Sequence, residues 1–356
     1  MSGPLLHLTT PTQWRAALAA GVLAPPSLTD IGYVHLSTPA QVALPADRLF
    51  RGRTDLLALM LNPARIGVEI RYEPGVPTDP ESMRFPHAYG PVPTHAVTAV
   101  VPYRPRPDGG FDAPTVPAPG PAGRLAGFEP SLLRRTATSE IPVTGGVAVL
   151  TAPVPESYEH NQLLIDGATG ADELAADADR TLGEAGIPHR RALLVGADLA
   201  PTAARLAERG WEVEQLVGMA APAGGEPDRR VEHVDREALR SMWDAEWQRD
   251  APEHCRLEEA VLDVRYLAVR AAGTAVASCL LKIDGGTALL DMIATDPRHR
   301  GRGYGDALLS TAGAVAADAG CDLVVLEAAA ADWPRHWYTR RGFAEVEQAW
   351  TVELTP

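Results

Sequence analysis

The chain has 356 residues, a length that predicts two or three compact domains. Its 46% hydrophobic and 22% charged residues are typical of globular proteins and exclude extensive disorder. The net charge of −14 argues against duplex nucleic acid as a partner, because such binding needs a basic surface. Neither an apolar run of membrane-spanning length nor a signal peptide is recognisable, so we expect a cytoplasmic protein without membrane contact.

The three cysteines indicate a reducing compartment. Cys255, Cys279 and Cys321 are far apart in the sequence and odd in number, so they form neither a disulfide framework nor a zinc motif. We therefore expect free thiols and no metal site.

Two segments rich in proline and glycine divide the chain. The segment 102–124 also contains aspartate, and this composition favours neither helix nor strand, which predicts an exposed linker. A shorter break lies at 221–229. The predicted organisation is a domain over 1–104, a linker over 105–124, and two further segments over 125–222 and 228–356.

The first segment begins with a predicted strand at 5–8 and a capped helix at 12–20. Further strands are expected at 33–37, 55–61 and 66–72. Several histidines lie at turns and strand ends. They are not spaced i, i+4, so a helical zinc motif is absent and a hydrogen-bonded structural histidine is the default interpretation of each.

Two motifs of this segment resemble a small uncharacterised bacterial domain family whose α+β fold is similar to that of ADP-ribosyltransferases. They are Gly32-Tyr33-Val34-His35-Leu36-Ser37 and Phe85-Pro86-His87-Ala88-Tyr89-Gly90. The resemblance implies one cleft for a nucleotide's ribose and phosphates, lined by His7, His35, Ser37, His87 and Tyr89. The catalytic glutamate of such transferases has no clear counterpart, Glu69 being the candidate. ADP-ribosyl transfer, binding of a nucleotide or a nucleic-acid end, and a structural or regulatory role remain open.

The middle segment is predicted to alternate strands with helices. Strands are expected at 147–151, 162–165, 192–195 and 211–219, and helices at 171–185 and 200–208. The last segment follows a similar order, with strands at 230–234, 264–270, 274–283, 288–295, 322–326 and 343–354, and helices at 235–247, 305–319 and 334–341. Residues 209–215 and 341–348 are also alike. We infer an internal repeat and a mixed α/β (α+β) fold.

Three alternating glycines, Gly301, Gly303 and Gly305, stand between an expected strand and an expected helix. Glycine lets backbone N–H groups turn inward, and the start of the helix adds the positive end of its dipole. The segment therefore predicts a cradle for a pyrophosphate, with further charge from Arg298, Arg300 and Arg302. It lacks the Gly-Lys-Ser/Thr ending of a P-loop and lies too late in the chain for a first Rossmann turn.

The last segment resembles the GCN5-related N-acetyltransferase (GNAT) family. Three stretches carry the resemblance in the family's order: Ile293-Ala294-Thr295-Asp296-Pro297, Arg300-Gly301-Arg302-Gly303-Tyr304-Gly305, and Tyr338-Thr339-Arg340-Arg341-Gly342-Phe343. The resemblance implies acetyl-CoA as cosubstrate, bound by Arg298, the loop Arg300 to Gly305 and the main chain of a splayed strand over Ile293, Ala294 and Thr295. It also implies acetyl transfer to a primary amine of a small molecule or peptide.

The resemblance makes Tyr338 the acid that protonates the leaving thiolate, with a core tyrosine as the alternative. The base is left open between Glu327 and Asp291, where burial would raise the pKa of either carboxylate, and both are open as substrate-orienting or structural acids. Glu246 and His254, expected in a loop, are weaker candidates. The acceptor and the oligomeric state are not readable from the sequence.

The middle segment resembles, more weakly, the degenerate half of a tandem acetyltransferase. Leu206 takes the place of Tyr338, and Gly167-Ala168-Thr169-Gly170 lacks the arginines and the glycine spacing. We expect this half to pack against the active half and to wall the acceptor pocket. Two alternatives remain: a non-catalytic protein that binds or senses acetyl-CoA, and a bifunctional enzyme whose N-terminal domain binds NAD or another nucleotide.

Overall fold

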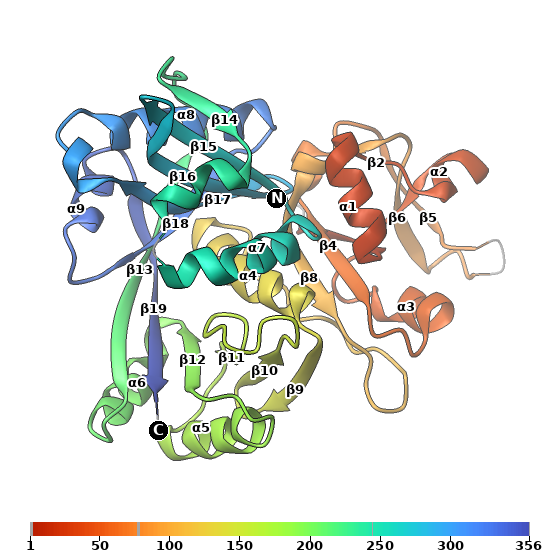
Figure 1. Cartoon of the computed structure of the whole chain (residues 1–356). Coiled ribbons are helices and arrows are strands. Elements are labelled where there is room, and N and C mark those ends of the chain that lie inside the picture. Colours follow the sequence, from red (N-terminus) through yellow and green to blue (C-terminus); the bar gives the residue numbers. More distant parts are fainter. Residues whose placement is uncertain (1–2, 77–78, 244, 356) are drawn as a thin grey trace.

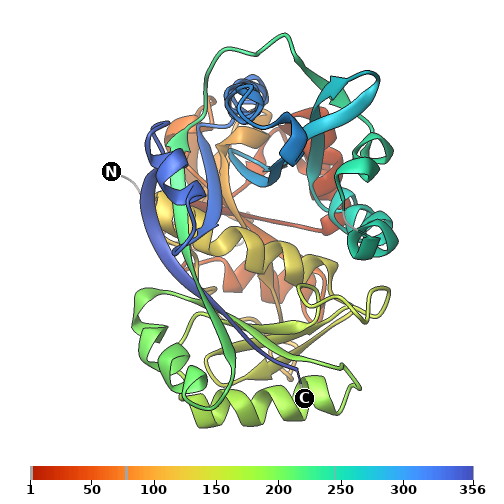
Figure 2. The ribbon, with the colours of Figure 1, turned by 60° about the vertical axis from the view of Figure 1, so that its left-hand side comes forward.

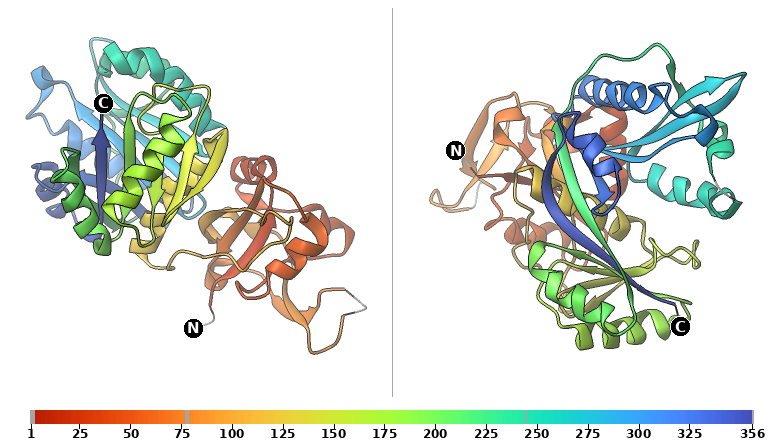
Figure 3. Two further views of the ribbon diagram at one scale, coloured as in Figure 1. Left: turned by 90° about the horizontal axis from the view of Figure 1, so that it is seen from below. Right: turned by 90° about the vertical axis from the view of Figure 1, so that its left-hand side faces the viewer.

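The computed structural model describes residues 3–76, 79–243 and 245–355, with the side chains of 245–251 left aside (Figure 1). An N-terminal domain lies beside two halves that share one large sheet, and a central helix lies between them (Figures 1 and 3). Within those described ranges, every helix is too short or too polar to cross a membrane.

The N-terminal domain contains three small sheets, with strand orders β1-β4-β8, β2-β7 and β3-β6-β5. Their strands are β1 (Leu5–Thr9), β2 (Val22–Leu23), β3 (Val34–His35), β4 (Leu56–Leu61), β5 (Ile70–Pro74), β6 (Arg84–Ala88), β7 (Val92–Pro93) and β8 (Val97–Tyr103). The helices are α1 (Pro11–Ala20), α2 (Pro26–Asp30) and α3 (Ala43–Phe50). The strand predicted at 66–72 begins later because a 3-10 turn at Pro63–Arg65 precedes it. The expected strand at 5–8 and helix at 12–20 are confirmed.

The central helix α4 (Pro121–Thr136) corrects the predicted linker, which was expected to run to residue 124 without a helix. Proline is well tolerated in a first helical turn, where its missing N–H has no intrahelical partner, so Pro121 can begin α4. Leu125, Phe128 and Leu132 are buried together against strands of the large sheet. Phe111, also in the predicted exposed linker, is buried in the core of the N-terminal domain.

The two halves form a single eleven-stranded sheet of order β14-β15-β16-β17-β18-β13-β19-β12-β11-β10-β9. The first half supplies β9 (Ser139–Val143), β10 (Gly146–Leu150), β11 (Gln162–Ile165), β12 (Arg190–Val195) and β13 (Glu212–Pro222). The second half supplies β14 (Val231–Val234), β15 (Asp263–Ala271), β16 (Thr274–Asp284), β17 (Thr287–Thr295), β18 (Leu323–Ala329) and β19 (Ala344–Leu354).

The halves exchange their last strands. The parallel pair β11–β12 of the first half corresponds to the parallel pair β17–β18 of the second. However, β13 of the first half pairs with β18, and β19 of the second half pairs with β12. The long strands β13 and β19 therefore lie side by side and run from one half into the other (Figure 2). The repeated order of elements agrees with the repeat inferred from the sequence.

Helices cover the sheet in both halves. The first half has α5 (Ala171–Ala178), which continues as a π-turn to Gly183, and α6 (Ala200–Ala207). The second half has α7 (Ala245–Glu259), α8 (Tyr304–Asp318) and α9 (Pro334–Thr339). The helix predicted over 235–247 is wrong in its bounds, because a 3-10 helix ends at Met242 before α7 begins. The loop expected around His254 is therefore helix α7.

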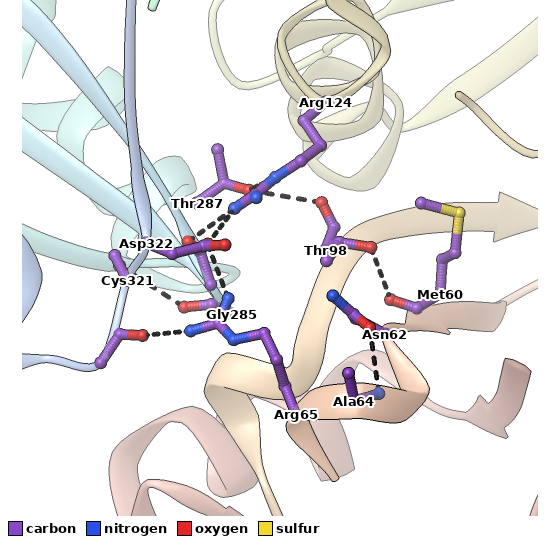
Figure 4. A network of polar contacts seen from close by, with 12 residues as sticks. Met60, Asn62, Ala64, Arg65, Thr98, Arg124, Gly285, Thr287, Cys321 and Asp322 are labelled. Atoms are coloured by element: carbon purple, nitrogen blue, oxygen red, sulfur yellow. Dashed lines mark hydrogen bonds and ion pairs between the residues drawn. The ribbon is translucent and has the colours of Figure 1, made fainter. Parts of the chain in front are cut away.

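The N-terminal domain is fixed to the second half through polar contacts at the β16–β17 turn (Figure 4). Arg65 donates to Asp322 Oδ1 at 2.6 Å and to the Gly320 carbonyl at 2.7 Å. From α4, Arg124 donates to the same Asp322 oxygen at 2.8 Å and to the Gly286 carbonyl at 2.7 Å. One carboxylate thus connects the N-terminal domain, the central helix and the sheet.

Candidate functional site

The site begins where β17 separates from β18. The two strands pair only from Thr287 to Leu289 on β17. Beyond that point the register of β17 against β16 shifts at a bulge, where Met292 has a φ of 50°. A positive φ is costly for a non-glycine residue and is often found at ligand sites. Because β18 diverges, the main chain of β17 from Leu290 to Thr295 has no ladder on that side.

A cavity of about 540 Å³ opens at this separation. It is bounded by the end of β17, the loop before α8, and α9. Most of the predicted coenzyme-binding residues are in its wall: Ile293, Ala294, Thr295, Arg300, Gly301, Gly303, Tyr304 and Gly305. Tyr338 of α9 closes one end.

Two glycines give the loop its shape. Gly301 and Gly303 have φ values of 74° and 72°, a left-handed conformation that glycine adopts without strain. Gly303 is the N-cap of α8 and provides no side chain to satisfy the first N–H groups of the helix. A Cβ added to Gly305 would come within 3.2 Å of the Trp337 ring. The start of α8 can therefore receive an anion in the cavity.

The three arginines predicted to bind phosphate all lie in the described residues, but they differ in whether their side chains reach the cavity. Arg300 is in the cavity wall and donates to the Thr295 carbonyl at 3.3 Å. Arg298 is exposed and forms an ion pair with Asp296 at 2.7 Å. Arg302 is exposed, and its carbonyl accepts a hydrogen bond from Arg230 at 3.2 Å. The structure thus brings only the first of these side chains to the cavity.

A second cavity of about 410 Å³ adjoins the first, and the two share Ile293, Pro334 and Tyr338. Its wall combines the central helix and both halves: Glu129 comes from α4, Glu159 from the β10–β11 loop of the first half, and Glu327 from β18 of the second. Tyr338 therefore lies at the boundary between the cavities. The expectation that the first half contributes to a pocket next to the coenzyme loop agrees with this lining.

Glu327 and Glu129, both half-buried, form a carboxyl pair in the second cavity. Burial and the nearby Asp291 carboxylate raise the pKa of Glu327 to about 7, although a hydrogen bond with Glu129 opposes the shift. Burial and the charge of Glu327 raise the pKa of Glu129 well above its ordinary value. Both carboxyl groups therefore keep their protons to higher pH than exposed glutamates do, and they titrate as a coupled pair.

Asp291 behaves differently from the expectation that burial would raise its pKa. Burial does act in that direction, but the Lys282 ammonium lies 2.7 Å from the carboxylate and holds its pKa below the ordinary value. Asp291 also accepts a hydrogen bond from the Met292 N–H at 2.7 Å, which fixes the bulge of β17. This acid is thus an ion-pair partner rather than a group poised to gain a proton.

Lys282 is surrounded by acids. Its ammonium is 2.7 Å from Glu258 as well as from Asp291, and both Lys282 and Glu258 are buried. Burial alone would lower the pKa of Lys282, but the two carboxylates raise it well above its ordinary value. Burial raises the pKa of Glu258 to about 7 against the opposing effect of Lys282.

Tyr338 is buried beneath the two cavities, 5% exposed. Burial, with the Cys279 and Asp291 groups, raises the pKa of its phenol above the usual range. The phenol therefore keeps its proton at neutral pH, as a proton donor must.

In the first half, the start of helix α5 and the residue in place of Tyr338 both differ from their counterparts in the second half. α5 begins after Gly170, whose N–H donates to the Glu173 carboxylate at 3.0 Å. An acid at this helix start repels phosphate, and Leu206, which replaces the tyrosine, is buried in a separate apolar core. Both features agree with the degenerate character expected of this half.

Three residues in the wall of the second cavity are not candidates from the sequence alone. Glu129 lies on the unpredicted helix α4, and Glu159 has no distinguishing pattern around it. Lys282 is the single lysine of the chain, and its position within an apolar strand is the signal that could have indicated a buried partner. Glu246, a weaker candidate for the base, lies outside the described side chains.

The histidines of the N-terminal domain do come together. His35 and His87 face each other across β3 and β6, and Tyr33 stacks on the His87 ring at 4.1 Å between centroids. His7 Nδ1 is 2.8 Å from the His35 carbonyl, and burial lowers the pKa of His7 to about 4. Ser37 is buried at its bridge to β1.

Acidic and phenolic groups complete this cluster. The phenol of Tyr89 donates to Glu73 at 2.7 Å, and Glu73 is 3.5 Å from His87 Nδ1. Glu69 instead pairs with Arg71. Glu73 is therefore the acid that faces the histidines.

Comparison with known proteins supports the family resemblances found near both ends of the chain. Residues 263–345 match the acetyltransferase (GNAT) domain, and residues 8–100 match a protein family of unknown function, DUF952. The chain matches no protein of curated function.

Solved structures of low identity resemble parts of the chain. A functionally unknown conserved protein from Staphylococcus epidermidis is 13% identical, with 61% of this chain and 94% of that chain covered and a TM-score of 0.51. A GCN5-related N-acetyltransferase from Kribbella flavida is 20% identical, with coverages of 66% and 96% and a TM-score of 0.49. A protein from Caulobacter crescentus is 26% identical, with coverages of 31% and 93% and a TM-score of 0.27.

The matched ranges contain the motifs from which the two resemblances were inferred, namely Arg300 to Gly305 in one and His35 and His87 in the other. The chain therefore carries an acetyltransferase domain of the GNAT family towards its C-terminus and a DUF952 domain of unknown function at its N-terminus.

Proposed function

We propose that the protein transfers an acetyl group from acetyl-CoA to a primary amine of a small molecule or peptide. The observation that carries the proposal is the meeting of two cavities at Tyr338. One has a glycine-lined helix start and an unpaired strand edge, and the other contains a carboxyl pair that titrates near neutral pH.

Acetyl-CoA supplies the activated acetyl group as a thioester. In this proposal its pyrophosphate binds the N–H groups from Gly301 to Gly305 and the guanidinium of Arg300. Main-chain groups at Ile293 and Thr295 bind the pantetheine arm along the unpaired edge of β17. An N–H of that edge stabilises the charge that develops on the thioester oxygen.

The acceptor amine occupies the second cavity. Glu327, directly or through one water, takes the proton from the ammonium, and the free amine attacks the thioester carbon. When the carbon–sulfur bond breaks, Tyr338 gives its proton to the thiolate. The nitrogen loses its second proton to solvent as the amide forms, Glu327 also releases its proton to solvent, and solvent returns one proton to Tyr338. The products are the acetylated amine, CoA with a thiol and one proton released to solvent.

The charge of the second cavity favours a cationic acceptor. Four carboxyl groups line it, and its two cationic residues are Lys282 and Arg191. Lys282 is already paired with Asp291 and Glu258, and Arg191 with Glu353 at 2.9 Å. The remaining acids, Glu129, Glu159 and Glu327, attract an amine that arrives as an ammonium ion.

The decisive experiment compares two glycine variants. Gly303→Glu places a carboxylate in the cradle and should abolish acetyl-CoA binding measured by calorimetry. Gly273→Glu is the matched control: Gly273 also has a positive φ and open space around it, but lies in the β15–β16 turn. Equal acetyl-CoA affinity in the two variants would refute the proposed cradle.

Two alternatives are separated by activity assays. A protein that only senses acetyl-CoA would bind it but release no thiol with any member of a panel of amines.

For the N-terminal domain we propose a nucleotide site, favoured by the Tyr33, His35 and His87 rings in mutual contact. It predicts NAD binding by the full chain that is lost in His35→Ala, and absence of binding to any nucleotide would overturn it.

A further inference from the structure

A group of potential metal ligands lies beside the second cavity. Glu159 and His160 are in the loop that joins β10 to β11 in the first half, and His254 is on α7 of the second half. One ligand atom from each residue lies within 4.8 Å of the others. The two imidazole rings are 4.7 Å apart between centroids. Neither histidine has a role in the acetyl transfer proposed above, and Glu159 takes part there only as one of the acids that attract the amine.

The Nε2 atom of His160 is available for a ligand. The residue is 1% exposed, and its Nδ1 is 3.2 Å from the Ser157 hydroxyl. Its Nε2 is buried and has no hydrogen-bond partner among the described residues. A buried nitrogen without a partner is costly, so it indicates a group that the protein is built to receive.

The contact of His160 Nδ1 with the Ser157 hydroxyl leaves Nε2 for a metal ion. A hydrogen bond at one ring nitrogen that leaves the other for the metal is the common arrangement of histidine ligands.

We infer that Glu159, His160 and His254 bind one divalent transition-metal ion of the Zn²⁺ class. Two imidazole nitrogens and one carboxylate oxygen form a donor set typical of zinc, whereas Mg²⁺ and Ca²⁺ prefer oxygen alone. Zinc bonds of about 2.0–2.1 Å place neighbouring ligand atoms roughly 3.4 Å apart, so the three side chains must converge by small rotations. Three protein ligands leave the fourth position to water.

The surroundings favour added positive charge. The Glu159 carboxylate acts electrostatically on Glu258, Glu129 and Glu327. The nearby cation Lys282 is already paired with two acids. A dication bound here relieves repulsion among these carboxylates.

The ion would connect the two halves across the exchanged sheet. Glu159 and His160 come from the first half, His254 comes from the second, and Glu159 also lines the second cavity. Metal binding would therefore fix α7 against the β10–β11 loop next to the cavity. This role does not depend on acetyl transfer.

The test uses the full chain, stripped of metal with a chelator and titrated with ZnCl₂ by calorimetry. We expect one Zn²⁺ per chain and a rise in the unfolding temperature that depends on zinc concentration. Glu159→Gln and His254→Gln should each weaken binding by about tenfold or more, and Ser157→Ala by about tenfold through the orientation of His160. The matched controls Glu156→Gln and His233→Gln, at exposed positions, should bind like the original protein.

Substitution with Co²⁺ gives a second measurement that does not need a ligand variant. Visible absorption bands of tetrahedral cobalt with nitrogen and oxygen ligands would support the site. Failure of the chelated protein to bind Zn²⁺, or equal affinity in His254→Gln and His233→Gln, would overturn the proposal. So would Mg²⁺ binding as tight as Zn²⁺ binding.

Discussion

Arg135 Nη2 donates to Asp284 Oδ2 at 2.5 Å, and both side chains are almost completely buried. The other oxygen of Asp284 accepts a hydrogen bond from the Trp14 indole at 2.8 Å. Trp14 belongs to the N-terminal domain, Arg135 to the central helix and Asp284 to the acetyltransferase sheet. One buried carboxylate therefore holds three parts of the chain together.

This pair predicts a large loss of stability in Arg135→Met. The variant leaves a charged carboxylate buried without its cation, which costs about 3–5 kcal/mol in the free energy of unfolding. Arg53→Met, which removes an exposed pair with Asp55, should cost at most about 1 kcal/mol. Urea unfolding of both variants tests the comparison, and similar losses would contradict it.

The activity should depend on the charge of Glu327. Because a base must be deprotonated and the pKa of Glu327 is raised to about 7, kcat/KM should rise with pH through neutrality. Glu327→Gln should lower the rate by about 10²–10⁴-fold and remove this limb of the profile. The control is Glu212→Gln, an exposed acid on β13. If Glu327→Gln retained the full pH profile, Glu327 would be excluded as the base.

Tyr338→Phe should slow thiol release while coenzyme binding persists. The ring and its packing against Phe343 remain, but the proton donor is lost, so kcat should fall by about 100-fold or more. Stopped-flow measurement of thiol formation at saturating acetyl-CoA gives this rate. Tyr72→Phe, at an exposed position of the N-terminal domain, is the control. An unchanged kcat would remove Tyr338 from the mechanism.

Glu129→Gln should change how stability depends on pH. The folded pKa of Glu129 lies above the unfolded value, so between those values the folded state holds more protons and stability falls as pH rises. Glutamine carries no charge, and the variant should therefore lose less stability than the original protein between pH 5 and pH 8. Unfolding free energies at the two pH values measure the difference. A steeper loss in the variant would be inconsistent with the carboxyl pair.

Calorimetry should find one acetyl-CoA per chain. The helix start of the first half is occupied by Glu173, whose carboxylate binds the Gly170 N–H. Two equivalent sites would show that the first half has kept its own coenzyme cradle.

The conformation of the glycine loop at 300–305 could be predicted from the sequence because it depends on local residues. Gly301 and Gly303 are needed for the backbone itself, and the helix behind them has a clear apolar pattern. The second cavity could not be predicted in this way. Glu129, Glu159 and Glu327 are brought together by a helix at the edge of a proline-rich segment and by pairing between distant strands. Glu327 alone of the three is a candidate from the sequence, and no pattern around Glu129 or Glu159 indicates that the three lie together.

The exchange of β13 and β19 also restricts how this protein can change during evolution. Gly218 on β13 is the direct neighbour of Glu327 on β18, so the first half supplies backbone at the position of the proposed base. Deletion of that half would leave β18 with a bare edge, which invites aggregation. The second half therefore depends on the first for a complete sheet, whatever the first half itself binds.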